Sequence, residues 1–259
     1  YNSFLDDKLS FQIGSFYEVQ KEDLSTMVLR PGDAYNIIGR VTFLPMNNDN
    51  LLHLGTSFAY RNRLTHNDDD YISQPFSISV RPENHLGTKL LQFDQPINTM
   101  GLVGAEAAFV KGPFSIQGQY MVSSLDKDYV NSEGVSVGND GVWNGTSNYN
   151  FSGYYGQLSY FLTGEKRNYK NSLSGFGRIA PKNRGALELA VRYSSINLDV
   201  KSGEHGTING GKLNNITIGL NAYYNASTRI MVNYVVGTMK NGEEEVNENA
   251  IIGRVQIDF

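Results

Sequence analysis

The sequence predicts an all-β fold, an antiparallel transmembrane β-barrel of the kind found in bacterial outer membranes. The first observation is the last stretch, Ala250 to Phe259, where alternate residues from Ile251 onward are apolar or Gly253. The other face carries Ile252 and three polar residues, one of them Arg254. A period of two residues is that of a strand, and an apolar and a polar face suit a wall between lipid and water. The alternative for this stretch is the last strand of a soluble β-sandwich.

Composition is the second observation. The 259 residues are 40% hydrophobic, and nowhere do about 18 apolar residues follow one another, so helical membrane spans are not predicted. The chain has no Cys, which excludes disulfides and thiolate metal sites. The formal charge of -4 is too small to indicate nucleic acid as a partner.

The third observation is that the alternation recurs along the chain, in about ten strands. In Ala186 to Ser195, for example, Leu189 and Val191 fall on the lipid side while Arg192 falls on the water side. The predicted strands are Leu9–Tyr17, Tyr35–Leu44, Leu51–Arg61, Thr99–Val110, Phe114–Val122, Phe151–Leu162, Ala186–Ser195, Asn215–Asn225, Ile230–Gly237 and Ala250–Phe259.

The connections between these strands alternate in length. Short turns are predicted at Pro45–Asn50, Lys111–Pro113 and Ala226–Arg229, with longer polar loops between them, one of them an acidic loop from Glu243 to Glu248. Outer-membrane barrels have short periplasmic turns and long external loops. The connection Asn62–Asn98 is long and contains an alternating piece that ends before Pro82, which indicates a functional loop or disorder.

One connection on the short-turn side is unusual in length and charge. Between Gly164 and Arg184 lie six basic residues and one acid, Glu165, whereas the rest of the chain is net acidic. We expect this segment to fold into the mouth of the pore. The alternative is a solvated periplasmic loop.

Several strings resemble the phosphate-selective porin O and P family, in the order that the family shows. They are GRVTFLP (Gly39–Pro45), LLHLG followed by YR (Leu51–Arg61), RPENH (Arg81–His85), KGPFSIQGQY (Lys111–Tyr120), FSGYYGQLSYFLTGEKRNYK (Phe151–Lys170), FGRIAPK (Phe176–Lys182) and GALELAVRYSSINL (Gly185–Leu198). The resemblance covers the chain from about Leu9 to Phe259.

The resemblance implies a homotrimeric barrel of about sixteen strands, of which residues 1–259 would be a single domain forming the carboxyl-terminal part. It implies inward-folded loops that narrow the pore, one of them matching Asn62–Asn98, and anion selectivity from an arginine ladder and a basic periplasmic region. Ladder positions before the RPE motif read Ser77, Ser79 and Arg81, so only one arginine is kept. We therefore expect moderate anion preference, with weak discrimination of phosphate from chloride.

The expected function is passive diffusion of small anions such as phosphate or pyrophosphate across the bacterial outer membrane, with a general porin or a glycan-binding β-domain as alternatives. Basic side chains in a narrow pore stabilise an anion that loses part of its hydration. For each inward arginine the alternative is a salt bridge with a wall carboxylate. The predicted pore-lining and anion-binding residues are Arg40, Arg61, Ser77, Ser79, Arg81, Lys166, Arg167, Lys170, Arg178, Lys182, Arg192 and Arg254.

No enzymatic activity, cofactor or metal is predicted. Of the four histidines only His53 falls on a predicted strand, and neither a metal-spaced partner nor a nucleophile motif accompanies it. Asp68–Asp70 could bind a cation, but a run of carboxylates is more often a solvated loop tip. The expected partners are the transported anions, outer-membrane lipid and two further copies of the chain.

Overall fold

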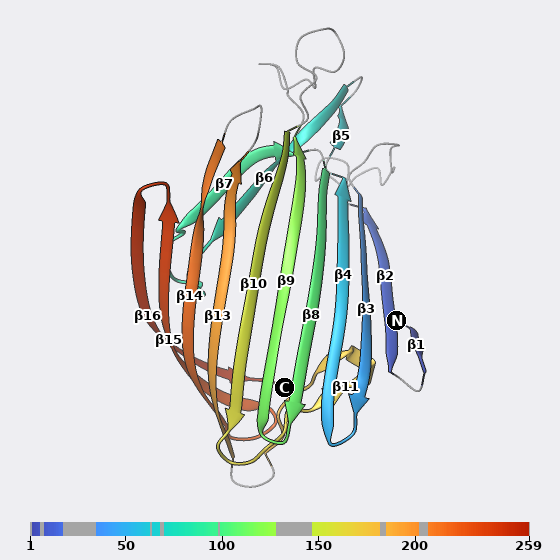
Figure 1. Cartoon of the computed structure of the whole chain (residues 1–259), viewed down its shortest axis with the longest axis vertical. Helices are drawn as coiled ribbons and strands as arrows, with labels where there is room; N and C mark the ends of the chain where they lie inside the picture. The colour runs from blue at the N-terminus through green and yellow to red at the C-terminus, as the bar shows by residue number, and fades with distance from the viewer. Residues whose placement is uncertain are drawn as a thin grey trace.

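A computed structural model describes residues 2–5, 8–17, 35–62, 64–67, 70–97, 99–127, 147–181, 185–201 and 207–258. Eleven of its strands form one curved antiparallel sheet (Figure 1). Their order across the sheet is β1 (Asn2–Phe4), β2 (Leu9–Tyr17), β3 (Tyr35–Asn47), β4 (Asn50–Asn62), β8 (Thr99–Lys111), β9 (Phe114–Lys127), β10 (Ser147–Phe161), β13 (Ala186–Lys201), β14 (Thr207–Tyr223), β15 (Thr228–Asn241) and β16 (Glu244–Ile257).

Ten of these strands correspond to the predicted ones, and β1 is additional. The edges of the sheet are β1 and β16, which do not pair with each other. The described strands therefore form an open, curved wall and do not close into a small barrel. Among the described residues, no helix is long and apolar enough to cross a membrane.

Some predicted connections are wrong in detail. The strand β3 continues through Pro45 to Asn47, because an irregularity in the pairing between Phe43 and Met46 accommodates the proline, and the turn shrinks to Asn48 and Asp49. The acidic stretch is a tight hairpin: Gly242 has a φ of 61° and Glu244 already begins β16. An acidic run can lie on an edge strand, where its charges face water.

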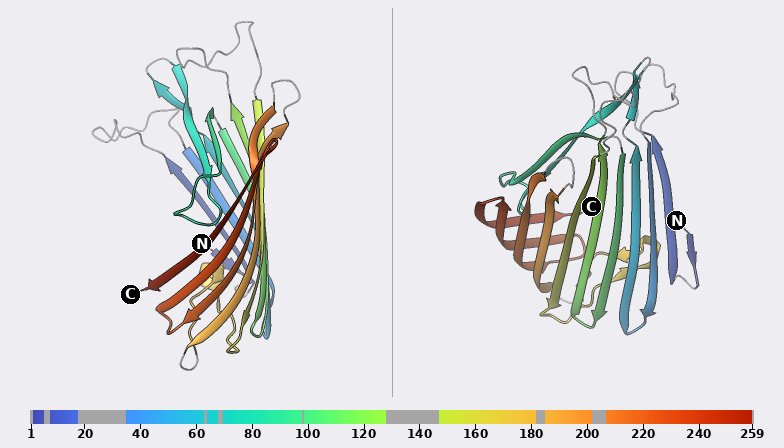
Figure 2. Two further views of the ribbon diagram at one scale, coloured as in Figure 1. Left: turned by 90° about the vertical axis from the view of Figure 1, so that its left-hand side faces the viewer. Right: turned by 45° about the horizontal axis from the view of Figure 1, so that its top comes forward.

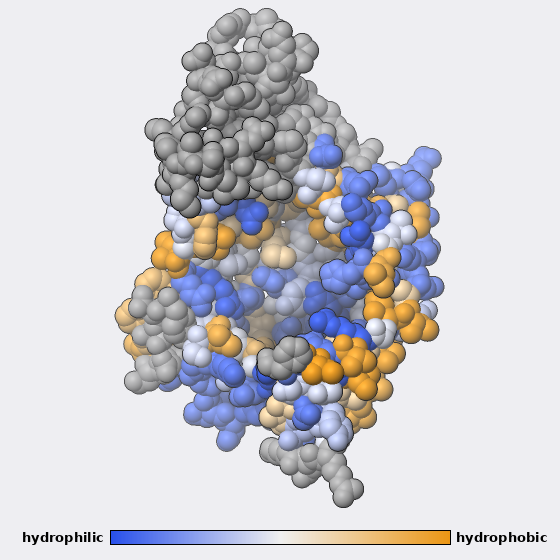
Figure 3. All heavy atoms as spheres, turned by 180° about the vertical axis from the view of Figure 1, so that it is seen from behind, coloured by the Kyte–Doolittle hydropathy of each residue, from blue (hydrophilic) through white to orange (hydrophobic). Residues whose placement is uncertain are grey.

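Side chains alternate across the wall as predicted. Leu189, Val191 and Leu220 are exposed on the outer, convex face, whereas Glu188 of the same strand β13 is buried on the inner face. Figure 3 looks onto the inner face, which is hollowed and largely hydrophilic, with hydrophobic residues gathered along the side of the wall. The wall thus separates an apolar surface from a polar hollow.

Two smaller sheets lie on the inner side of the wall (Figure 2). The connection Asn62–Asn98 contains β5 (Leu64–Asn67), β6 (Asp70–Val80) and β7 (Leu91–Ile97), which form a three-stranded sheet. The connection after β10 contains β11 (Tyr169–Lys170), a 3-10 helix (Asn171–Leu173) and β12 (Gly175–Phe176). These two insertions carry most of the predicted site residues.

Candidate functional site

The β6–β7 hairpin packs one face against the upper part of the inner wall, as drawn in Figure 1. Ile78 and Val80 of β6 and Leu91, Phe93 and Ile97 of β7 form this face. They share a core with wall residues from β9, β10, β13, β14 and β15, namely Leu125, Tyr149, Phe151, Leu198, Val200, Leu213 and Met239. The hairpin is therefore an internal layer held by apolar burial.

The opposite face of this hairpin is polar and points away from the wall. Ser77 and Ser79 are exposed there, because they alternate with the wall-facing Ile78 and Val80. Asp94 lies opposite Ser77 in the strand pairing and is also exposed. The predicted ladder positions therefore lie on the free face, together with one carboxylate.

Arg81 follows the hairpin's first strand on this side. Its Nε donates to the carbonyl oxygen of Gly87 at 2.9 Å, which holds one edge of the guanidinium. Among the described residues no carboxylate forms an ion pair with Arg81. Its charge is thus available to an anion in the hollow.

Arg192, by contrast, has a carboxylate partner. Its Nε donates to Glu83 Oε1 at 2.8 Å, and its guanidinium lies over the Tyr155 ring at 3.8 Å from the centroid. The salt-bridge alternative considered for the inward arginines therefore holds at this position. It also holds for Arg40, whose Nε and Nη2 donate to Glu106 Oε1 at 3.0 and 2.5 Å.

Glu106 is the centre of a network that joins the lower wall to the basic connection. Because the ionised carboxylate only accepts, His53 Nε2 donates to Glu106 Oε1 at 3.1 Å, and a hydrogen bond of 2.8 Å joins His53 Nδ1 to the Tyr169 hydroxyl. Arg40 Nη2 also donates to the Ser174 carbonyl oxygen at 3.1 Å. Two residues of the connection are thereby attached to buried or half-buried wall groups.

Apolar contacts complete this attachment. Tyr169 and Phe176 pack against the buried wall residues Leu44, Leu51 and Val110. The described part of the segment, up to residue 181, therefore folds onto the inner wall and does not hang free, while its place in the mouth of a pore stays a prediction. Lys182 and Arg184 lie outside the described residues.

The basic side chains of this segment differ in their surroundings. Arg167 Nη1 donates to Gln117 Oε1 at 2.5 Å, and its guanidinium lies 4.3 Å from the centroid of the Phe176 ring. Burial lowers the pKa of Arg167, and the Glu188 carboxylate opposes that shift, so the guanidinium stays charged at neutral pH. Lys166 Nζ is exposed and donates to the carbonyl oxygens of Asn48 and Asp49 at 3.3 and 2.7 Å.

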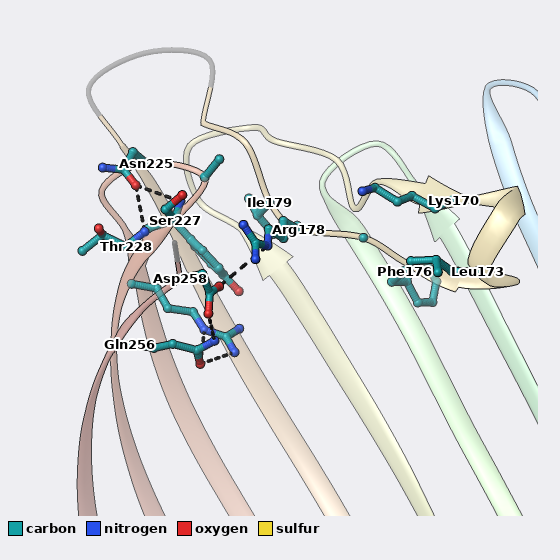
Figure 4. A pocket seen from close by; sticks show the side chains of 14 residues that line it. Lys170, Leu173, Phe176, Arg178, Ile179, Asn225, Ser227, Thr228, Gln256 and Asp258 are labelled. Atoms are coloured by element: carbon teal, nitrogen blue, oxygen red, sulfur yellow. Dashed lines mark hydrogen bonds and ion pairs between the residues drawn. The ribbon is translucent and has the colours of Figure 1, made fainter.

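A pocket of about 350 Å³ lies between this connection, the β14–β15 turn and the end of β16 (Figure 4). Lys170, Arg178 and Arg229 line it together with Asp258. Arg178 Nε lies 3.8 Å from Asp258 Oδ2, whereas Arg229 donates to the neutral Gln256 Oε1, at 3.1 Å from Nε and 2.8 Å from Nη2. Positive groups therefore outnumber the single carboxylate at this lower rim.

Arg61 and Arg254 are the remaining predicted residues. Arg61 lies on β4 near the upper end, and its buried Nε has no hydrogen-bond partner in the described part of the chain. Arg254 is exposed on the edge strand β16. The structure thus distributes the predicted residues from the upper to the lower end of the hollow and gathers no single binding cluster.

Sequence reasoning missed Glu83, Tyr169 and Arg229 as structurally important residues of the hollow. Glu83 was part of the recognised RPENH string, but its role needs the position of the hairpin relative to the wall. Arg229 was assigned to a turn, although β15 begins at Thr228. No group of three or more potential metal ligands occurs among the described residues.

Comparison with known proteins identifies the family. The family model for phosphate-selective porin O and P matches residues 6–259. Porin O of Pseudomonas aeruginosa is 28% identical over 254 residues, which cover 85% of this chain and 52% of that protein. An uncharacterized protein of Caulobacter vibrioides is 26% identical over 241 residues, which cover 88% of this chain and 43% of that protein.

The chain therefore spans about half the length of the curated relatives it matches. Membership of a porin family agrees with the expectation that the chain is not an enzyme. Because the family model matches nearly all of its residues, the chain belongs to the phosphate-selective porin O and P family.

Proposed function

We propose that the complete protein is an outer-membrane channel through which small anions such as phosphate or pyrophosphate diffuse passively. Family membership and the wall, apolar outside and polar inside, support a porin. The exposed apolar face also argues against a soluble glycan-binding domain, since that face would lie in water. Assembly as a homotrimer is part of the same proposal.

The distribution of ion pairs carries the argument for anions. Glu83 of the hairpin connection and the inner-wall carboxylates Glu106 and Glu188 each accept hydrogen bonds from the protein's own donors. Arg81, Lys170 and Arg254 have no ion pair among the described residues. A permeating ion therefore meets more available positive than negative charge, which lowers the barrier for anions and raises it for cations.

The preference should be moderate. On the free face of the hairpin, Ser77 and Ser79 can donate hydrogen bonds to an oxyanion but carry no charge, and Asp94 repels it. The neutralised Arg40 and Arg192 favour the second candidate, a general porin with little selectivity. The two candidates differ in how far the channel distinguishes anions from cations.

The test is a planar-bilayer recording of the complete protein under a salt gradient. An anion-preferring channel gives a reversal potential of the anion-selective sign, and a general porin gives a value near zero. Phosphate added to chloride should inhibit the current only weakly. A reversal potential of the cation-selective sign would refute the anion proposal, and submillimolar phosphate block would show that the two serines suffice for tight binding.

A further inference from the structure

Glu83 occupies the turn between β6 and β7 and points into the wall. Its backbone has a φ of 48°, a left-handed conformation that residues other than glycine rarely adopt. The preceding Pro82 is buried, and a Cβ added to Gly237 of β15 would meet the Pro82 Cβ at 2.7 Å. The wall therefore holds this turn closely in one position.

The carboxylate of Glu83 accepts hydrogen bonds from two wall strands. Oε1 accepts from Arg192 Nε at 2.8 Å and from the Ser194 hydroxyl at 2.7 Å, both on β13. Oε2 accepts from the Thr217 hydroxyl at 2.6 Å, on β14. Three donors from the wall thus meet one carboxylate from the hairpin.

Arg192 is at the same time open to the hollow. It lines a recess of about 350 Å³, together with Glu83, Thr217 and the amide side chains of Gln157, Asn221 and Asn233. Its side chain is 33% exposed, so a solute in the recess can reach the guanidinium. The charge that this solute meets depends on whether the Glu83 carboxylate is present.

We propose that Glu83 is a specificity-determining residue of the channel: it cancels the charge of Arg192 at the recess and fixes the β6–β7 hairpin to the wall. The proposal rests on the proposed channel function. On this proposal Arg192 adds little to anion preference although it faces the hollow, since Arg192 and Glu83 together contribute no net charge.

The test separates the charge from the attachment. In Glu83→Gln the amide oxygen still accepts from Arg192 and Ser194, and the amide nitrogen can donate to Thr217, so the hairpin stays in place without its negative charge. The anion-to-cation permeability ratio of the complete protein, measured in bilayers, should rise about two- to threefold, with single-channel conductance little changed. Glu243→Gln, in the exposed β15–β16 turn, removes the same charge elsewhere and should leave the ratio nearly unchanged.

Arg192→Gln supplies the decisive comparison. It leaves Glu83 without its cation and should lower the permeability ratio, whereas Glu83→Gln raises it, and the double variant should return close to the wild-type ratio. If Glu83 only attached the hairpin, both single variants would shift the permeability ratio in the same direction. That result would overturn the proposal. So would an unchanged ratio in Glu83→Gln.

These outcomes are independent of the wild-type sign. If the wild-type channel prefers cations, the proposed anion function fails, but opposite shifts of the two single variants still support the role of Glu83. If the wild-type channel prefers anions and the two shifts agree in direction, the function stands and the role of Glu83 is refuted.

Discussion

Replacing Glu106 by glutamine should destabilise the attachment between the lower wall and the basic connection. The carboxylate accepts two bonds from Arg40 and one from His53, and Arg40 in turn donates to the Ser174 carbonyl oxygen. Removing one partner of a fully buried ion pair costs about 3–5 kcal/mol, and exposed pairs contribute about 0–1 kcal/mol. The side chains of Arg40 and Glu106 are 29% and 24% exposed, so a loss of about 2 kcal/mol is expected.

The assay is guanidinium-induced unfolding of the complete protein in lipid vesicles, followed by far-UV circular dichroism. The matched control is Glu245→Gln, whose partner Lys240 lies at 2.9 Å in a pair that is 59% and 48% exposed. That substitution should change stability by less than about 0.5 kcal/mol. Equal losses for the two variants would show that the Glu106 network contributes no more than a surface pair and would refute the reasoning.

Three further outcomes are expected. Ser79→Arg adds a charge on the free face of the hairpin and should strengthen phosphate inhibition of the chloride current; unchanged inhibition would exclude this face from the ion path. Replacing the basic side chains within residues 166–178 by glutamine should lower the anion-to-cation permeability ratio, and no change would indicate that the connection only fills space. Cysteine at Leu220 should be shielded from a water-soluble maleimide whereas cysteine at Asn233 should react, and the reverse pattern would invert the assigned faces.

Alternation predicted the wall because it assigns each residue to a face without knowledge of its neighbours. It predicted that Arg192 faces the hollow, but not that Glu83 neutralises it, since the two residues are 109 positions apart and meet only when the hairpin packs on the wall. The basic connection was assigned to the pore mouth from its length and its charge. Its actual attachment depends on Tyr169 and on apolar contacts, which the charge pattern does not reveal.

Several strand ends at the upper end of the wall were misplaced in the same way. β14 begins at Thr207 where Asn215 was expected, and β9 continues to Lys127 where Val122 was expected. Both errors fall at the upper end of the wall. Apolar residues there, such as Leu125 and Leu213, lie on the inner face, where the hairpin covers them. A prediction based on apolar residues of the outer face therefore makes these strands too short.

Apolar residues thus lie on the outer face in the lower part of the wall and on the inner face at its upper end. This change of face marks the upper limit of the apolar outer surface. Along β14, the outward positions Ile218 and Ile216 are exposed and apolar, whereas Lys212, on the same side nearer the upper end, is exposed and charged. Leu213 beside it is fully buried on the inner side. The outward side of this one strand is therefore apolar up to Ile216 and charged at Lys212, and in the proposed channel the hydrocarbon boundary would fall between these two residues.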